Sequence, residues 1–127
     1  ALAFIRFRDN FECYRCIRLP RFLRAMALPV KYPELVQKYS RQRDLDPYIV
    51  FSLIREESYF RSGAVSYANA YGLLQLLLRT ARQRSGRGVR LYRSHLFQPE
   101  TNIRYGTKYL RLLLDKYDDR IHRALAA

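Results

Sequence analysis

The adjacent glutamates Glu56 and Glu57 are the side chains in this sequence best suited to acid–base chemistry. A proline at position 47 suits the first turn of a helix, and we predict that this helix runs from Pro47 to about Ser58. Its apolar stripe is formed by Val50, Leu53 and Ile54. Glu57 continues that stripe, whereas Glu56 lies about 100° around the helix and is expected to be solvated.

A glutamate that faces the core has its ionised form disfavoured, so its pKa rises and it can keep a proton near neutral pH. A general acid needs this property, and Glu57 is therefore the candidate catalytic residue. The alternative is that Glu57, near a helix end, reaches water or pairs with an arginine. From spacing alone this alternative is the commoner case, because helix-end glutamates far outnumber catalytic ones.

Length and charge restrict the kinds of partner. The chain has 127 residues, about half of them hydrophobic, which suits one domain with a core of its own. It carries 24 Lys and Arg residues against 11 Asp and Glu residues, a formal net charge of +13. Such an excess attracts polyanions such as nucleic acid, anionic lipid or acidic cell-wall polymer. No apolar run reaches the roughly 18 residues of a membrane span, and arginines interrupt any signal-like start.

Cys13 and Cys16 form a single C-x-x-C pair, and His95 and His122 lie far from it in the sequence. A four-ligand zinc site therefore has little support, and we expect neither a metal nor a cofactor. A thioredoxin-like site would require a βαβ pattern, which the sequence lacks. Two half-buried small residues on a helix are the commoner interpretation, and a local disulfide or a reactive thiol is the alternative.

The remaining segments predict an all-α fold. Residues 1–31 alternate arginine with apolar residues and contain two prolines, which favours one or two short basic helices. Residues 33–43 should form the next helix, before the one that carries Glu57. A long central helix from Pro99 to about Tyr117 carries two apolar stripes, and a short helix should begin near Asp119. No segment of useful length alternates polar and apolar residues as a strand would.

Between these helices the sequence predicts loops. Residues 61–71 are small and polar, which favours a loop close to other backbone, and residues 84–98 should form an exposed loop. Residues 72–78 are apolar nearly all round and should be buried. Gln75 within them must find polar partners, either a ligand in a cleft or backbone carbonyls in a core. Gly106, inside the long helix, predicts close contact with another helix.

Four motifs in this order resemble the catalytic domain of soluble lytic murein transglycosylases. They are Glu57-Ser58, Ala64-Val65-Ser66, Gly72-Leu73-Leu74-Gln75 with Thr80-Ala81, and Pro99-Glu100-Thr101-Asn102-Ile103 with Gly106-Thr107-Lys108-Tyr109-Leu110. The resemblance covers residues 32–127, and residues 1–31 would be a basic helical lead-in or the tail of a preceding helical domain. It implies a lysozyme-like helical fold that cleaves the β-1,4 bond between N-acetylmuramic acid and N-acetylglucosamine. The product would carry a 1,6-anhydro ring.

The resemblance also implies roles for individual residues. Glu57 would protonate the glycosidic oxygen and then take the proton of the substrate's own 6-hydroxyl, so a second carboxylate is not required. Ser66 and Gln75 would hydrogen-bond sugar substituents, while Leu77 would form an apolar wall of the cleft. Structural support would come from Ser58, Gly72, Asn102, Gly106 and Tyr109.

The sequence departs from the family pattern at several positions. Arg61-Ser62 stand where the family usually has Asn-Pro, Leu74 replaces a methionine and Leu78 replaces a proline. Leucine for methionine changes a core little, whereas loss of the proline loosens the start of the next helix. The family's Ala-Tyr-Asn-Ala-Gly segment would follow Ala127, so we expect a domain that is incomplete at its C-terminal end and less active for that reason.

The implied partners are peptidoglycan glycan strands, with electrostatic contact to an anionic envelope surface, in the periplasm or cell envelope. Two other classes of function stay open. One is a catalytically silent relative that binds glycan or a protein through the same cleft. The other is a basic helical nucleic-acid-binding module, for which arginines spread over the whole chain are weak support, and no specific nucleic acid is expected.

Overall fold

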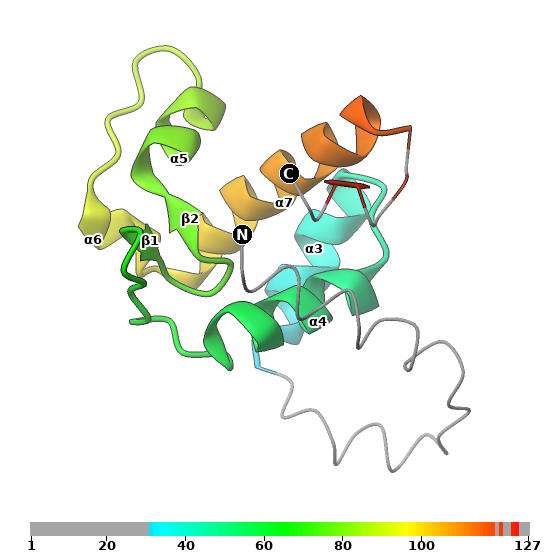
Figure 1. Ribbon diagram of the computed structural model, residues 1–127, viewed down its shortest axis with the longest axis horizontal. Coiled ribbons are helices and arrows are strands. Elements are labelled where there is room, and N and C mark those ends of the chain that lie inside the picture. The colour runs from blue at the N-terminus through cyan, green and yellow to red at the C-terminus, as the bar shows by residue number, and fades with distance from the viewer. Residues whose placement is uncertain (1–30, 119, 121–122, 125–127) are drawn as a thin grey trace.

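The computed structural model describes residues 31–118, 120 and 123–124 (Figure 1). Of the predicted helices of residues 1–31, residues 1–30, with Cys13 and Cys16, lie outside this part of the chain, as do His122 and most of the predicted last helix. The elements are α3 (Pro33–Gln42), α4 (Pro47–Ser58), β1 (Ala70–Tyr71), β2 (Leu76–Leu77), α5 (Leu78–Ser85), α6 (Arg93–Leu96) and α7 (Pro99–Lys116).

Helices α3, α4 and α7 begin and end within one residue of their predicted positions. Each has a proline in its first turn, where the fixed φ suits the helix and the missing N–H leaves no hydrogen bond unmade. The carboxylate of Asp46 caps α4, accepting a 2.9 Å hydrogen bond from the backbone N–H of Tyr48. Local signals in the sequence therefore fix the helix that carries Glu57.

Helix α7 is the central element, as predicted. It packs against α3, α5 and α6 and runs through the middle of the molecule (Figure 1). Its buried residues are Asn102, Ile103, Tyr105, Gly106, Thr107, Leu110, Leu113 and Leu114. The second of the two predicted apolar stripes, Tyr105, Tyr109 and Leu112, is not buried along its whole length, because Leu112 is 38 % exposed. No helix in the described part of the chain is both long and apolar enough to span a membrane.

A small antiparallel sheet accompanies the helices. Strands β1 and β2 pair Ala70 with Leu77 and Tyr71 with Leu76. Two-residue strands are too short to show a period of two, so the sequence pattern does not reveal them. The described part of the chain is nevertheless predominantly helical, and the predicted helical class is confirmed.

Two predictions about the loops are wrong. Residues 84–98 are not one exposed loop, because α5 extends to Ser85 and α6 forms within this range, with Leu91 and Leu96 buried. Residues 72–78 are not buried throughout, because Leu77 is 44 % exposed. Its neighbour Leu76 points into the core, and alternate residues of a strand face opposite sides.

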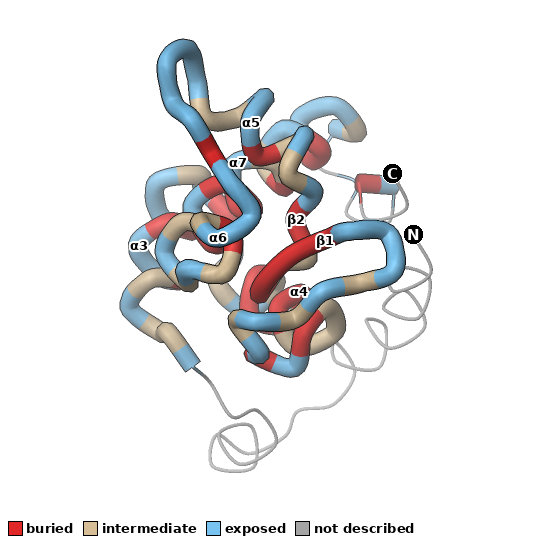
Figure 2. The backbone as a smooth tube through the Cα atoms, turned by 90° about the vertical axis from the view of Figure 1, so that its left-hand side faces the viewer, coloured by how far each residue is buried: buried red, intermediate tan, exposed pale blue. Residues whose placement is uncertain are grey.

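Among the described residues the hydrophobic core forms two clusters. Buried residues are coloured red in Figure 2. The larger joins α3, α4 and α7, and the smaller lies under the sheet, α5 and α6. Tyr109 of α7 packs against both clusters. Leu74, in the segment between the strands, packs against the larger cluster, which also contains Leu53 and Ile54 of α4.

Candidate active site

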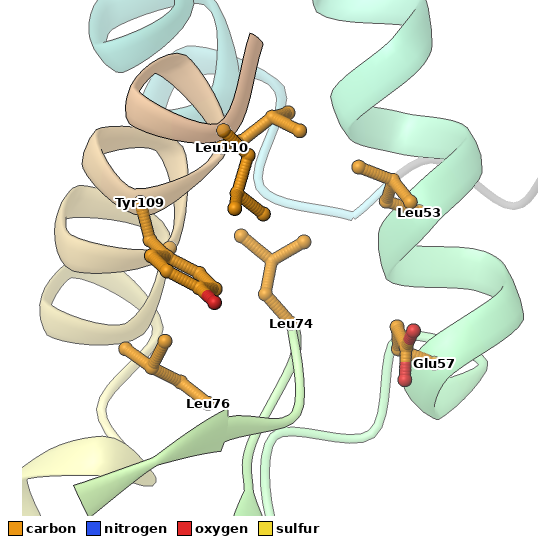
Figure 3. A pocket seen from close by; sticks show the side chains of 8 residues that line it. Leu53, Glu57, Leu74, Leu76, Tyr109 and Leu110 are labelled. Atoms are coloured by element: carbon orange, nitrogen blue, oxygen red, sulfur yellow. The ribbon is translucent and has the colours of Figure 1, made fainter. Parts of the chain in front are cut away.

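Glu57 lies in the last turn of α4, and its side chain borders a small pocket that also touches α7 and the segment entering β2 (Figure 3). The pocket has a volume of about 50 Å³. It is lined by Leu53, Glu57, Leu74, Leu76, Gly106, Tyr109, Leu110 and Leu113. In this lining Glu57 is the single carboxyl group and Tyr109 the other polar side chain.

The pocket changes the acidity of Glu57. Burial raises its pKa from 4.5 to about 7, because the charged form loses hydration among apolar side chains. The negative charge of Glu56 acts in the same direction. The carboxyl group therefore keeps its proton in a substantial share of molecules at neutral pH.

The two glutamates differ in position as the helical spacing predicts. Glu57 lines the pocket, whereas Glu56 does not. Glu56 is half-buried and not fully solvated, so the prediction of a solvated side chain is only partly right.

The chain turns sharply after Glu57. The hydroxyl of Ser58 is buried and donates a 3.0 Å hydrogen bond to the carbonyl of Ile54, while the Ser58 carbonyl accepts one from Nε of Arg61. Phe60 then adopts a φ of 59°, which is strained for a bulky residue. Its ring is 2 % exposed, and this burial in the core offsets the strain.

Asn102 fixes the opposite wall of the pocket. Its side chain is fully buried. The Oδ1 atom accepts a 2.8 Å hydrogen bond from the N–H of Leu74. The Nδ2 atom donates hydrogen bonds to the carbonyls of Tyr71 and Leu96, each at 2.8 Å. Gly72 lies against it with a φ of 76°, and a Cβ there would overlap the Asn102 amide and the Leu96 carbonyl. One amide therefore holds the loop, α6 and α7 together.

Gly106 of α7 allows Leu74 to reach the pocket. A Cβ built on Gly106 would overlap Cδ1 of Leu74 and would lie 3.1 Å from its Cβ. The predicted close approach is therefore present, but the contact is with the segment between the strands and not with a helix. Leu74 stands between α7 and Glu57 in Figure 3.

Gln75 and Ser66 organise the loop. The Nε2 of Gln75 donates hydrogen bonds to the carbonyls of Gly72 at 2.8 Å and Ala64 at 3.2 Å. The sequence left two kinds of partner open for Gln75, a ligand in a cleft or backbone carbonyls. In the structure, backbone carbonyls accept the hydrogen bonds of its amide nitrogen. The Oγ of Ser66 accepts a 3.2 Å hydrogen bond from the N–H of Ala70.

The structure brings together some of the predicted site residues and not others. Glu57, Gly106 and Tyr109 line one pocket, whereas Ser66, Gln75 and Leu77 do not belong to its lining. Tyr109, expected only as support, lies across this pocket from Glu57 (Figure 3).

Sequence reasoning overlooked Leu74 and Leu113 as pocket residues. A partial signal exists for α7, since Gly106, Tyr109 and Leu113 are spaced by three and four residues and so share one helix face. No comparable signal exists for Leu74, because its contact with α7 spans a long stretch of sequence. Within the described residues, no group of three or more His, Cys, Asp and Glu side chains is arranged to hold a metal ion.

Comparison with known proteins yields a consistent set of relatives. The chain is 38 % identical to membrane-bound lytic murein transglycosylase C of Haemophilus ducreyi over 96 residues, which are 72 % of this chain and 26 % of that protein. The protein of the same name from Actinobacillus pleuropneumoniae is 38 % identical over 91 residues, 68 % of this chain and 25 % of that protein. The chain thus spans about a quarter of the length of these curated relatives.

Solved structures show the same fold. The lytic transglycosylase Slt of Pseudomonas aeruginosa superimposes with a TM-score of 0.69 at 29 % identity, over 75 % of this chain and 16 % of that one. The 70-kDa soluble lytic transglycosylase of Escherichia coli gives the same TM-score and coverage at 24 % identity, which shows the fold alone. A family model described as the transglycosylase SLT domain matches residues 34–127. The chain therefore belongs to the transglycosylase SLT domain family.

Proposed function

We propose that residues 32–127 are the catalytic domain of a peptidoglycan lytic transglycosylase, and that residues 1–31 lead into it. The reaction cleaves the β-1,4 bond between N-acetylmuramic acid and N-acetylglucosamine and forms 1,6-anhydro-N-acetylmuramic acid. The observation that carries this proposal is the carboxyl group of Glu57, held in an apolar pocket with its pKa raised to about 7. The Slt structure from Pseudomonas aeruginosa is described as an inactive mutant with glutamine in place of a glutamate, which supports an essential glutamate in that relative.

In the proposed reaction Glu57 serves first as acid and then as base. Its carboxyl proton passes to the glycosidic oxygen as the bond from that oxygen to C1 of the muramic acid breaks. The 6-hydroxyl oxygen of the same sugar bonds to C1, and its proton passes to the Glu57 carboxylate. Glu57 ends protonated and no water is consumed, so one carboxyl group suffices where an ordinary glycosidase needs two.

We propose that Ser66, Gln75 and Leu77 contact the glycan beside the Glu57 pocket. The amide nitrogen of Gln75 is occupied by two backbone carbonyls, so its Oε1 is the atom offered to a sugar hydroxyl or acetamido N–H. The exposed side chain of Leu77 provides an apolar surface for a sugar ring. The proposed partners are glycan strands and an anionic envelope surface, in the periplasm or cell envelope, with no specific nucleic acid.

Product analysis tests this proposal. Purified peptidoglycan is incubated with the chain, and the released muropeptides are identified by mass spectrometry. We expect anhydro-muropeptides, which are lighter than hydrolysis products by one water molecule. Reducing-end muropeptides would instead indicate a hydrolase, and glycan binding without any product would indicate the catalytically silent relative; either result overturns the proposal.

A further inference from the structure

The segment from Ser58 to Pro99 contains seven arginines and no aspartate or glutamate. Six of these arginines fall within residues 78–96, which comprise α5, the following loop and α6 and are here called the α5–α6 lobe. They are Arg79, Arg82, Arg84, Arg87, Arg90 and Arg93. In Figure 1 the loop of this lobe projects from the molecule, on the side away from α3 and α4.

Some cations of this region hold the lobe in shape. Nε of Arg82 donates a 3.0 Å hydrogen bond to the carbonyl of Leu91, which ties α5 to the far end of the loop. Nζ of Lys108 on α7 donates a 2.7 Å hydrogen bond to the carbonyl of Arg84. The guanidinium of Arg93 lies 5.8 Å from the centre of the Tyr71 ring.

Arg87 and Arg90, at the tip of the loop, are not used in this way. Both are exposed, and the two salt bridges found among the described residues lie elsewhere, on Lys38 and Arg111. Both side chains are therefore accessible to solvent. Gly88, between them, has a φ of 85°, and apart from its chain neighbours no atom lies within 4 Å of the point that a Cβ would occupy, so the backbone is uncovered at that point.

The same tip exposes apolar surface. Val89 lies between the two arginines and is 47 % exposed. Leu91 is buried in the smaller core cluster, so it anchors the end of the loop to the body of the domain. Tyr92 follows this anchor as the N-cap residue of α6, where its ring packs 5.6 Å from the ring of His95. The projecting part of the loop therefore carries two cations and one exposed apolar side chain within four residues of the sequence.

We propose that the α5–α6 lobe binds the surface of an anionic phospholipid membrane. Arg87 and Arg90 contact headgroup phosphates, while Val89 enters the boundary between headgroups and acyl chains. A projecting tip fits a flat surface, whereas non-specific nucleic-acid binding uses a basic groove with aromatic faces for stacking. This proposal does not rest on the catalytic function. Vesicle binding and glycan cleavage are therefore measured independently, and the failure of one leaves the other standing.

Vesicle co-sedimentation measures the proposed binding. The probe is vesicles of equimolar phosphatidylglycerol and phosphatidylcholine, compared with vesicles of phosphatidylcholine alone. We expect binding to the anionic vesicles only, weakened by salt, and about 30-fold weaker after the double substitution Arg87→Gln and Arg90→Gln. The matched control is Arg41→Gln with Lys116→Gln, which removes the same charge from the last turns of α3 and α7 and should retain most of the binding.

A fluorescence probe reports insertion of the tip. The chain has no tryptophan, so Val89→Trp introduces a single reporter, and its emission should shift to shorter wavelength with anionic vesicles. Tyr48→Trp at the exposed start of α4 is the control and should not shift. The proposal is overturned if the two double variants bind vesicles equally, if the Val89→Trp emission does not move, or if the chain binds a DNA duplex but not the anionic vesicles.

Discussion

At the scale of single residues, the acidity of Glu57 follows from where the helix places it. A carboxyl group three and four residues beyond Ile54 and Leu53 shares their face, and both of these residues belong to the larger core cluster. Burial therefore acts on Glu57, whose pKa rises to about 7. This cause can be tested by stability alone, without any substrate.

The substitution Glu57→Gln should stabilise the fold at neutral pH and above. Since the pKa is raised in the folded state, the wild-type protein loses stability as the pH rises from about 4.5 to about 7, whereas the glutamine variant has no such loss. The gain should reach about 2 kcal/mol above pH 7, after allowance for partial exposure to solvent, and should vanish near pH 4. Urea unfolding across this pH range measures it. A constant difference at all pH values would contradict the account.

The substitution Gln75→Leu should lower stability. Its Nε2 donates to the carbonyls of Gly72 and Ala64, and leucine loses both hydrogen bonds, which costs about 1–2 kcal/mol. From the sequence alone, the leucines on both sides of Gln75 would suggest that leucine at this position changes stability little. The two hydrogen bonds in the structure predict a loss of stability instead. Thermal unfolding checks it, with Gln83→Leu on the exposed face of α5 as the matched control. Equal melting temperatures for the two variants would show that these hydrogen bonds contribute nothing.

At the scale of elements, the packing of α7 against the segment between the strands shapes the pocket. Glycine inside an exposed helix is usually less stable than alanine by about 1 kcal/mol. At position 106 of α7 we expect the opposite order, because the space that an alanine Cβ would need is filled by Leu74.

Gly106→Ala should therefore destabilise the protein by about 2 kcal/mol. If overlap with Leu74 is the cause, Leu74→Ala should relieve it, and the double variant should be more stable than the sum of the single effects by about 1–2 kcal/mol. A double-mutant cycle by urea unfolding measures this coupling. Gly63→Ala, where no atom lies within 4 Å, is the control and should change stability by less than about 0.5 kcal/mol. Additive effects at Gly106 and Leu74 would rule out the overlap.

The elements also show what a sequence can predict and what it cannot. The bounds of α4 and the face of Glu57 were predictable, because a cap, a proline and helical spacing are local signals. The two strands and α6 were not, since elements of two to four residues are too short to display a period. The position of Leu74 was not predictable either, because its contact with Gly106 depends on the tertiary fold.

At the scale of the whole molecule, the fold separates the proposed catalytic group from the basic α5–α6 lobe. Glu57 lies at the end of α4, whereas the α5–α6 lobe carries six arginines on the far side of the small sheet (Figure 1). The net charge of +13 is therefore not evidence for a nucleic-acid function at the Glu57 pocket, whose lining holds no arginine or lysine.

The central claim is that Glu57 in its apolar pocket is the acid of a lytic transglycosylase. The most direct test is the rate of anhydro-muropeptide release from purified peptidoglycan by Glu57→Gln and by Glu56→Gln, with folding of both checked by circular dichroism. Glutamine at position 57 keeps the shape but removes the transferable proton, so we predict a loss of activity of about 100-fold or more. Glutamine at position 56, outside the pocket lining, should leave the rate nearly unchanged. Equal losses in the two variants, or an active Glu57→Gln variant, would contradict the claim.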